Sequence, residues 1–96
     1  MGTMEESAKK IAEILKILAN KNRLLILCAL MREKMTVNQI AEHVPYITQS
    51  ALSQHLIMLK VAGVLDSEKS GLNVTYYIAD HRVEEVIAVL KKYYCE

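Results

Sequence analysis

The sequence lacks the features that mark several large classes of protein. Its 96 residues contain one proline, three glycines and two cysteines, and neither tryptophan nor phenylalanine. So little proline and glycine, beside 52% hydrophobic residues, excludes a disordered or low-complexity chain. Two cysteines do not make a disulfide framework. They are core thiols, a switch, or residues without a role.

Long apolar runs are also missing. The longest covers residues 24–31, whereas a helix needs about 20 apolar residues to cross a bilayer. No basic segment followed by an apolar one opens the chain, so we expect no signal peptide, no membrane partner and a cytoplasmic protein. The length predicts one domain over residues 1–96.

Neither sign of charge dominates. Twelve Lys and Arg residues stand against 11 Asp and Glu residues, which gives a net charge of +1. The net charge therefore does not indicate whether the partner is a polyanion, and the local distribution of charged residues has to be considered instead. No carboxylate occurs between Glu42 and Asp66. That gap is the clearest local feature of the charge pattern.

Hydrophobic periodicity predicts four helices in the first two thirds of the chain. An amphipathic helix is expected over residues 5–18. A second helix, which Asn20 is expected to cap, is predicted over 21–32; it is apolar almost all round and therefore central. A capping box at Thr36 predicts a short helix over 37–43, and Pro45 ends it in a turn. Thr48 then caps a longer helix over 49–62, which Gly63 stops. Two helices joined by a tight turn outline a helix-turn-helix.

The last third predicts a hairpin and a final helix. Two alternating stretches, residues 64–69 and 74–78, flank a polar turn and predict a β-hairpin. Asp80 is expected to cap a helix over 81–94 whose apolar residues cover two faces. Together with the first helix, it therefore predicts a dimer through the first and last helices. The predicted fold is mainly α with a small β-hairpin, a winged helix-turn-helix.

The helix from Gln49 has one arc suited to DNA. Its polar arc holds Gln49, Ser50, Ser53, Gln54 and Lys60, together with Ile57 and Val61. The opposite arc holds Ala51, Leu52, Met58 and Leu59, with Leu56 at its edge. Short amide and hydroxyl side chains near a helix start reach base edges, and the start beside Thr48 suits a phosphate. The alternative is an ordinary solvated face rich in Ser and Gln.

Histidines give no sign of an enzyme. His43, His55 and His81 lie on three different segments, and neither a glycine-rich phosphate loop nor a nucleophile elbow is present. His55 falls within the apolar arc, where a histidine is either a packed residue or a DNA contact. We expect no catalytic activity and no cofactor.

Three ordered motifs resemble the ArsR/SmtB family of bacterial repressors. Residues 50–56, SALSQHL, resemble the family's recognition helix, residues 18–27 its second helix, and residues 74–77 its second wing strand. The resemblance covers roughly residues 8–96. It implies a dimeric winged-helix repressor whose ligand weakens DNA binding. The wing departs from the family, because two adjacent basic residues of the family align with Glu68 and Lys69, and a carboxylate facing phosphates would be repelled.

The resemblance also bears on what such a repressor would sense. The family's thiolate site aligns with Thr36 and Asn38, which offer no thiolate. The ligand positions of its second metal site align with Asp80, Arg82, Tyr93 and Glu96. A cationic Arg82 breaks that set, and His81 would point about 100° away. No metal is therefore expected, and a metal-responsive repressor with a non-standard site remains the alternative.

The cysteines are the remaining candidates. Cys28 in the second helix and Cys95 near the end resemble the dithiol of the family's branch of haemolysin activators and biofilm-growth repressors. That resemblance implies a switch by oxidation or persulfidation. Physical chemistry alone favours a small core residue at Cys28 and a frayed end at Cys95, because burial and a helix C-terminus both disfavour a thiolate.

The sequence thus predicts a repressor of double-stranded DNA with an imperfect inverted-repeat operator. Bases would be read by Gln49, Ser50, Ser53 and Gln54, with His55 as a further candidate. Phosphates would be contacted by Thr48, Lys60 and Lys69. A protein-interaction module on the same fold is the other alternative.

Overall fold

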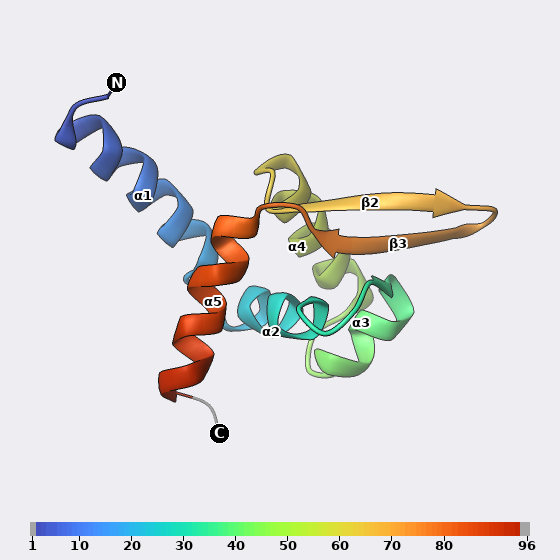
Figure 1. Cartoon of the computed structure of the whole chain (residues 1–96). Helices are drawn as coiled ribbons and strands as arrows, with labels where there is room; N and C mark the ends of the chain where they lie inside the picture. The colour runs from blue at the N-terminus through green and yellow to red at the C-terminus, as the bar shows by residue number, and fades with distance from the viewer. Residues whose placement is uncertain (1, 95–96) are drawn as a thin grey trace.

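The computed structural model describes residues 2–94 and confirms a winged helix-turn-helix (Figure 1). The described chain forms five helices and three strands. They are α1 (Met4–Leu18), α2 (Lys21–Leu30), β1 (Met35–Thr36), α3 (Val37–His43), α4 (Gln49–Val61), β2 (Leu65–Ser70), β3 (Asn73–Ile78) and α5 (His81–Tyr94).

Helix starts follow the predicted caps. The carboxamide of Asn20 accepts the amides of Asn22 and Arg23 at 3.0 and 3.2 Å, which satisfies two amides that the first turn of α2 leaves without partners. The other predicted caps are Thr36 with its capping box for α3, Thr48 for α4, and Asp80, whose carboxylate accepts the amide of Arg82 in α5. Thr3, which was not predicted, caps α1.

Two helix ends differ from the expectation. We expected α2 to run to residue 32, but it ends at Leu30, and the amide of Arg32 bonds instead to the carbonyl of Ala29 at 3.1 Å. The chain must turn there to enter β1 at Met35. Apolar residues continue in the sequence past the last residue of the helix, so their pattern predicted a helix that was too long. Helix α4 ends at Val61, one residue early, before Gly63 at φ +80°.

The hairpin belongs to a three-stranded antiparallel sheet in the order β1-β3-β2. Leu65 of β2 pairs with Ile78 of β3, and Met35 of the two-residue β1 pairs with Tyr76. Strand β1 was not expected, because two residues carry no alternating pattern. Gly71, at the tip of the hairpin, has φ +63°, which favours glycine. We call β2, β3 and this turn the wing.

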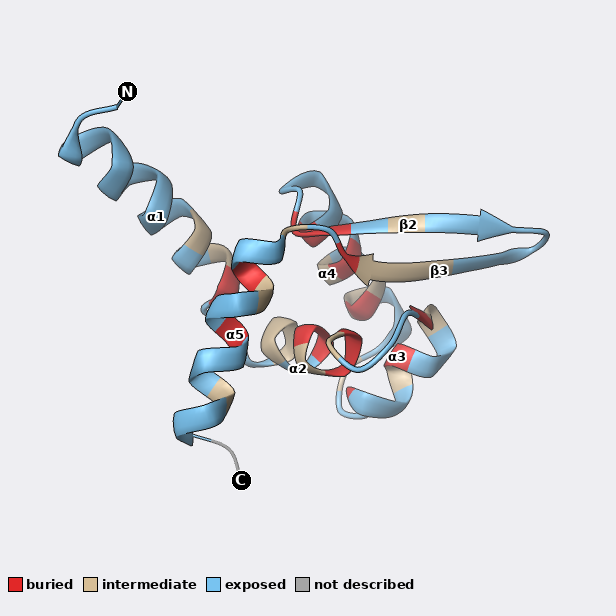
Figure 2. Ribbon diagram, in the orientation of Figure 1, coloured by how far each residue is buried: buried red, intermediate tan, exposed pale blue. Residues whose placement is uncertain are grey.

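The core lies between α2, α3, α4, the start of the wing and one side of α5 (Figure 2). Ile26 and Leu27 of α2 are fully buried, which confirms the central place predicted for that helix. Ile40, Leu59 and Val64 are equally inaccessible to solvent. The outer part of the wing is almost entirely exposed, as Figure 2 shows. The base of the wing is therefore packed in the core, whereas its tip is exposed to solvent.

Helix α1 projects from the body on the side opposite the wing (Figure 1). Within α1 only Leu18 is buried, while Ile11 and Leu15 remain more than half exposed at 58% and 52%. The described chain measures 45 × 32 × 22 Å along its principal axes. Among the described residues, no helix combines the length and the apolar character that crossing a membrane requires.

Candidate DNA-binding interface

Helix α4 is anchored in the core along one stripe. Leu52, Leu56 and Leu59 are each at most 1% exposed. Because these residues recur at intervals of three and four, they lie on one side of the helix. The opposite side of α4 is consequently fixed toward solvent by the fold.

The position of this stripe corrects the predicted arc. We placed Leu56 at the edge of the apolar arc and Met58 within it, but Leu56 is only 1% exposed, whereas Met58 is 47% exposed. The helix is rotated because three fully buried leucines outweigh one methionine in burying apolar surface. Ile57 and Val61 lie on the outward side, as predicted, and are 60% and 83% exposed.

The outward side of α4 carries most of the residues predicted to read bases. Gln49, Ser50 and Gln54 are exposed, whereas Ser53 is half-buried at the edge nearer the wing. Thr48 is also exposed, and its hydroxyl accepts the amide of Ala51 at 3.0 Å. No carboxylate lies on α4, so nothing on this helix would repel a phosphate backbone.

His55 points away from that side, toward α2. Arg23 of α2 donates from Nε to Nδ1 of His55 at 3.3 Å, and from Nη1 to the carbonyl of Ile17 in α1 at 3.0 Å. Burial, and secondly the charge of Arg23, hold the pKa of His55 below its ordinary value. His55 is thus placed in a junction of three helices rather than on the outward side.

Lys60 joins α4 to the wing. Its Nζ donates to the hydroxyl of Ser67 in β2 at 2.7 Å. Side chains alternate along a strand, so Lys69 projects from the same face of the hairpin as Ser67, while Glu68 projects from the other. Lys69 is exposed on the face that meets α4. The two lysines predicted to contact phosphates therefore lie on one side of the molecule.

The acidic residue of the wing has a partner. Glu68 accepts a hydrogen bond from Nζ of Lys34, which precedes β1, and this ammonium also lies 5.4 Å from the ring centroid of Tyr77. The hydrogen bond and the charge of Glu68 raise the pKa of Lys34. Glu68 consequently faces away from α4 with its charge matched. The carboxylate of Glu68 is therefore not an isolated negative charge on the wing.

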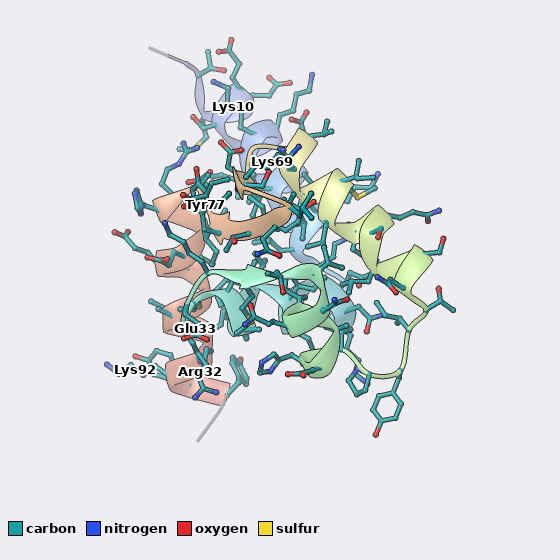
Figure 3. The ribbon with its side chains drawn as sticks, turned by 90° about the vertical axis from the view of Figure 1, so that its right-hand side faces the viewer. Lys10, Arg32, Glu33, Lys69, Tyr77 and Lys92 are labelled. Carbon is teal, nitrogen blue, oxygen red and sulfur yellow. The ribbon has the colours of Figure 1, made fainter. Side chains whose placement is uncertain are left out.

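The other basic side chains are spread over the molecule. Figure 3 places Lys10 on α1, Lys69 on the wing and Arg32 on the turn after α2. No large basic patch is needed to explain DNA binding if the uncharged side of α4 supplies the base contacts. Specificity would then depend on hydrogen bonds and apolar contacts in the groove.

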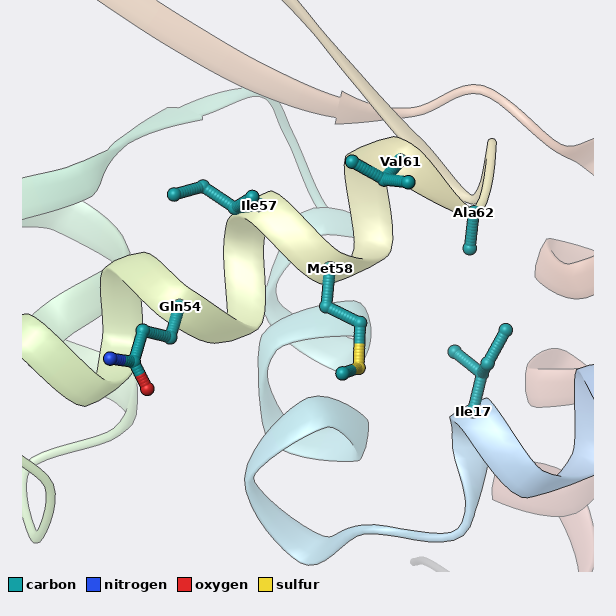
Figure 4. A pocket seen from close by; sticks show the side chains of 6 residues that line it. All are labelled: Ile17, Gln54, Ile57, Met58, Val61 and Ala62. Atoms are coloured by element: carbon teal, nitrogen blue, oxygen red, sulfur yellow. The ribbon is translucent and has the colours of Figure 1, made fainter.

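A shallow apolar pocket of about 540 Å³ lies beside the outward side of α4 (Figure 4). Its lining residues are Ile17, Gln54, Ile57, Met58, Val61 and Ala62. In Figure 4 the side chain of Met58 projects from the side of α4 on which Ile17 of α1 lies, while Gln54, Ile57 and Val61 follow one another along α4. The pocket is therefore formed by the junction of α1 with α4.

A second groove, of about 550 Å³, runs between α1 and α5. Ile11 and Leu15 line it from α1, and Val83 and Val86 line it from α5. Further along α5, Val89 and Leu90 are 54% and 45% exposed. More than half of the exposed large hydrophobic residues of the described chain lie on these two helices.

Of the two cysteines, the structure describes Cys28 alone. Cys28 is half-buried on α2 and packs against the core. Cys95 and Glu96 lie outside the described residues. Helix α5, which ends one residue before Cys95, contacts α2. The place of Cys28 fits the prediction of a thiol on the second helix and leaves its role open.

Asp80 and Arg82, two of the residues aligned with the family's second metal site, form an ion pair with each other. Arg82 donates from Nε and Nη2 to the two carboxylate oxygens of Asp80 at 3.1 and 3.0 Å, which lowers the pKa of Asp80. Tyr93 is 73% exposed. Within residues 2–94, no three His, Cys, Asp or Glu side chains come together in a group that could hold a metal ion.

Two positioning residues were missed in the sequence. Arg23 and Lys34 each reach across the fold, by 32 and 34 residues along the chain. No periodicity or spacing signals such contacts. Arg23 lies within a motif that resembles the family's second helix, and that is the only hint the sequence offers.

Comparison with known proteins identifies a family and several relatives that this chain resembles. Residues 20–67 match the family model described as bacterial regulatory protein, arsR family. The chain is 34% identical to the transcriptional activator HlyU of Vibrio cholerae over 93 residues, which is 97% of this chain and 85% of that one. It is 30% identical to the biofilm growth-associated repressor of Agrobacterium fabrum, with 96% and 78% covered.

Solved structures agree along nearly the whole chain. The reduced form of HlyU from Vibrio cholerae matches with a TM-score of 0.90 at 34% identity, covering 97% of each chain. A predicted DNA-binding transcriptional regulator from Escherichia coli matches with a TM-score of 0.86 at 32% identity, covering 95% and 96%. A homodimeric winged helix-turn-helix DNA-binding domain from Mycobacterium bovis matches at 0.78 and 27%, covering 94% and 84%.

Proposed function

The chain belongs to the arsR family of bacterial regulatory proteins and is a DNA-binding transcription regulator, not an enzyme; within that class, we propose that it is a homodimeric, sequence-specific repressor with a thiol switch. The observation that carries the proposal is the outward side of α4. It is uncharged apart from Lys60, exposed, and held in place by three buried leucines. Residues 1–96 would form one domain.

Base reading falls to the first two turns of α4. Gln54 and Gln49 can each pair with an adenine through two hydrogen bonds, and Ser50 and Ser53 can bond to several bases. Gln54 is the strongest candidate because it is exposed opposite the buried stripe. His55 is consistent with this role of Gln54, since its hydrogen bond with Arg23 directs it toward α2 and away from the outward side.

The residues proposed to contact phosphates lie at the two ends of the recognition helix and on the wing. Thr48 and the amides beside it lie at the start of α4, where a phosphate oxygen finds hydrogen-bond donors. Lys60 lies near the other end and Lys69 on the adjacent face of the wing. With Glu68 turned away and paired with Lys34, the wing can approach the backbone through Lys69.

The second copy would cover α1 and α5. Both helices expose apolar residues, which do not stabilise a monomer while they face water, and a groove runs between the two helices. The related domain from Mycobacterium bovis is homodimeric. A two-fold dimer predicts an imperfect inverted repeat with half-sites about one helical turn apart.

The switch would link Cys28 with Cys95. Oxidation by hydrogen peroxide removes two electrons and two protons from the pair of thiols and joins the sulfurs, while the peroxide leaves as two waters. With a low-molecular-weight persulfide, two molecules each transfer their outer sulfur to one thiol and leave as thiols, and the two protein persulfides then condense to a trisulfide with loss of hydrogen sulfide. Cys28 lies on α2, which also carries Arg23, so a new link on α2 would disturb the contact to α4. HlyU, a relative with a solved reduced form, supports redox chemistry as the input.

The test is DNA binding by fluorescence anisotropy. Reduced protein is titrated onto the DNA upstream of its own gene, then again after persulfide or peroxide treatment and after re-reduction. We expect affinity to fall on oxidation and return with reductant, and Cys28→Ser and Cys95→Ser each to abolish the response. Equal binding by reduced and treated protein would make the cysteines structural. Metal bound to protein purified without chelator would then favour the metal-responsive alternative.

A further inference from the structure

The outward side of α4 is only half polar. Four residues lie along it opposite the buried leucines, and we call them the outer stripe: Ser50, Gln54, Ile57 and Val61. Ile57 is 60% exposed and Val61 is 83% exposed. The stripe therefore begins with hydrogen-bonding side chains and ends with branched apolar ones.

Folding gives no reason for an isoleucine at position 57. A β-branched side chain is a weaker helix former than the Lys, Glu or Gln usual at exposed positions. Ile57 lies outside the buried core, and in Figure 4 its side chain points away from the side of α4 on which Ile17 of α1 lies. Its apolar surface remains available to a partner.

The position along α4 matches the spacing of base pairs. Ile57 follows Gln54 by three residues, or about 4.5 Å of helix rise, and successive base pairs are about 3.4 Å apart. A helix lying along the major groove with Gln54 on one base pair thus brings Ile57 to the next one or two. Ser50 lies one turn on the other side of Gln54.

The major groove offers one kind of apolar group, the 5-methyl group of thymine. Isoleucine suits it because its stiff χ1 loses little freedom on contact. No carboxylate lies between Glu42 and Asp66 to oppose close approach to DNA. We propose that Ile57 is a specificity-determining residue that packs on a thymine methyl group beside the base read by Gln54. This inference rests on the proposed role of α4 in reading DNA.

The test removes the methyl group alone. An operator is first selected from random duplex DNA with the full-length protein, and each thymine in it is then replaced by deoxyuridine. For wild type we expect a loss of about fourfold per buried methyl group at one thymine of each half-site. Ile57→Ala should bind the thymine operator more weakly than the wild type does. It should also bind the thymine and deoxyuridine operators with equal affinity. Ile57→Val should keep part of the preference.

Controls separate this inference from the proposed function. Met58→Ala changes a neighbouring exposed residue off the outer stripe and should keep the wild-type ratio between thymine and deoxyuridine. Circular dichroism confirms that each variant is folded. If the wild type binds every deoxyuridine operator as tightly as the thymine one, or if Ile57→Ala keeps the ratio, the inference is wrong while DNA binding stands. If no operator can be selected, the proposed function itself fails.

Discussion

Arg23 donates two hydrogen bonds that tie three helices together: one from Nε to Nδ1 of His55 in α4, and one from Nη1 to the carbonyl of Ile17 in α1. One side chain thus connects the helix proposed to pair with a second copy to the helix proposed to read DNA. His55 must be neutral at Nδ1 to accept this bond. The junction predicts effects on both stability and pH dependence.

Removing the guanidinium should destabilise the fold. Arg23→Ala leaves the half-buried His55 nitrogen and the Ile17 carbonyl without this donor, at a cost of about 1–3 kcal/mol. Urea denaturation measures the loss. Lys21→Ala, an exposed change in the first turn of the same helix, is the control and should stay within about 0.5 kcal/mol of wild type. A loss no larger than that for Arg23→Ala would mean that the junction contributes nothing to stability.

His55 should make stability depend on pH. Because folding lowers the pKa of His55, the unfolded chain takes up the proton at a higher pH than the folded one. Its stabilisation is therefore complete above the unfolded pKa of about 6.5 and is lost as the pH falls through the folded pKa. His55→Gln should flatten the fall in urea midpoint between about pH 7.5 and pH 5. An unchanged profile in His55→Gln would assign the pH dependence to other groups.

The two sides of α4 should respond to mutation in opposite ways. Leu56 is 1% exposed, so Leu56→Ala should cost about 2–5 kcal/mol through lost burial and a cavity. Ser50→Ala lies on the outer stripe and should leave the unfolding free energy within about 0.5 kcal/mol of wild type while weakening operator binding. A stable Leu56→Ala variant would show that the rotation of α4 described above is incorrect.

Lys34 should matter for DNA binding more than for folding. The exposed pair with Glu68 is expected to contribute at most about 1 kcal/mol to stability. Lys34→Ala leaves the Glu68 carboxylate unmatched on the wing and should lower DNA affinity, most strongly at low salt. Lys34→Ala with Glu68→Gln should recover part of the loss. Without such recovery, the pairing of Glu68 would have no bearing on the approach of the wing to DNA.

The fold was largely predictable because its signals are local. Caps at Asn20, Thr36 and Thr48 fix helix starts through hydrogen bonds within three residues, and all three were confirmed. The end of α2 and the strand β1 were missed, since both depend on how the chain turns between Leu30 and Met35. Tertiary packing decided them.

The candidate site was predictable in composition but not in orientation. The Ser- and Gln-rich arc was visible from residues 49–54, yet its rotation depended on whether Leu56 or Met58 faced the core. A helical wheel treats both residues as apolar. Only the packing of α4 against the core distinguishes Leu56, which is 1% exposed, from Met58, which is 47% exposed. Contacts between distant positions, such as Lys34 with Glu68, leave no trace in local pattern.

DNA binding by Gln54→Ala tests most directly whether the outer stripe of α4 reads sequence. Affinities of wild type and Gln54→Ala are measured by fluorescence anisotropy for the selected operator and for each of its single-base variants. Lys69→Ala is the control. It should weaken binding to all sequences alike and reduce the salt slope by about two, which is about one for each subunit of the dimer. We expect Gln54→Ala to lose about 1–3 kcal/mol of discrimination at one base position in each half-site. Unchanged affinity and unchanged preference at every position would contradict the proposed orientation of the recognition helix.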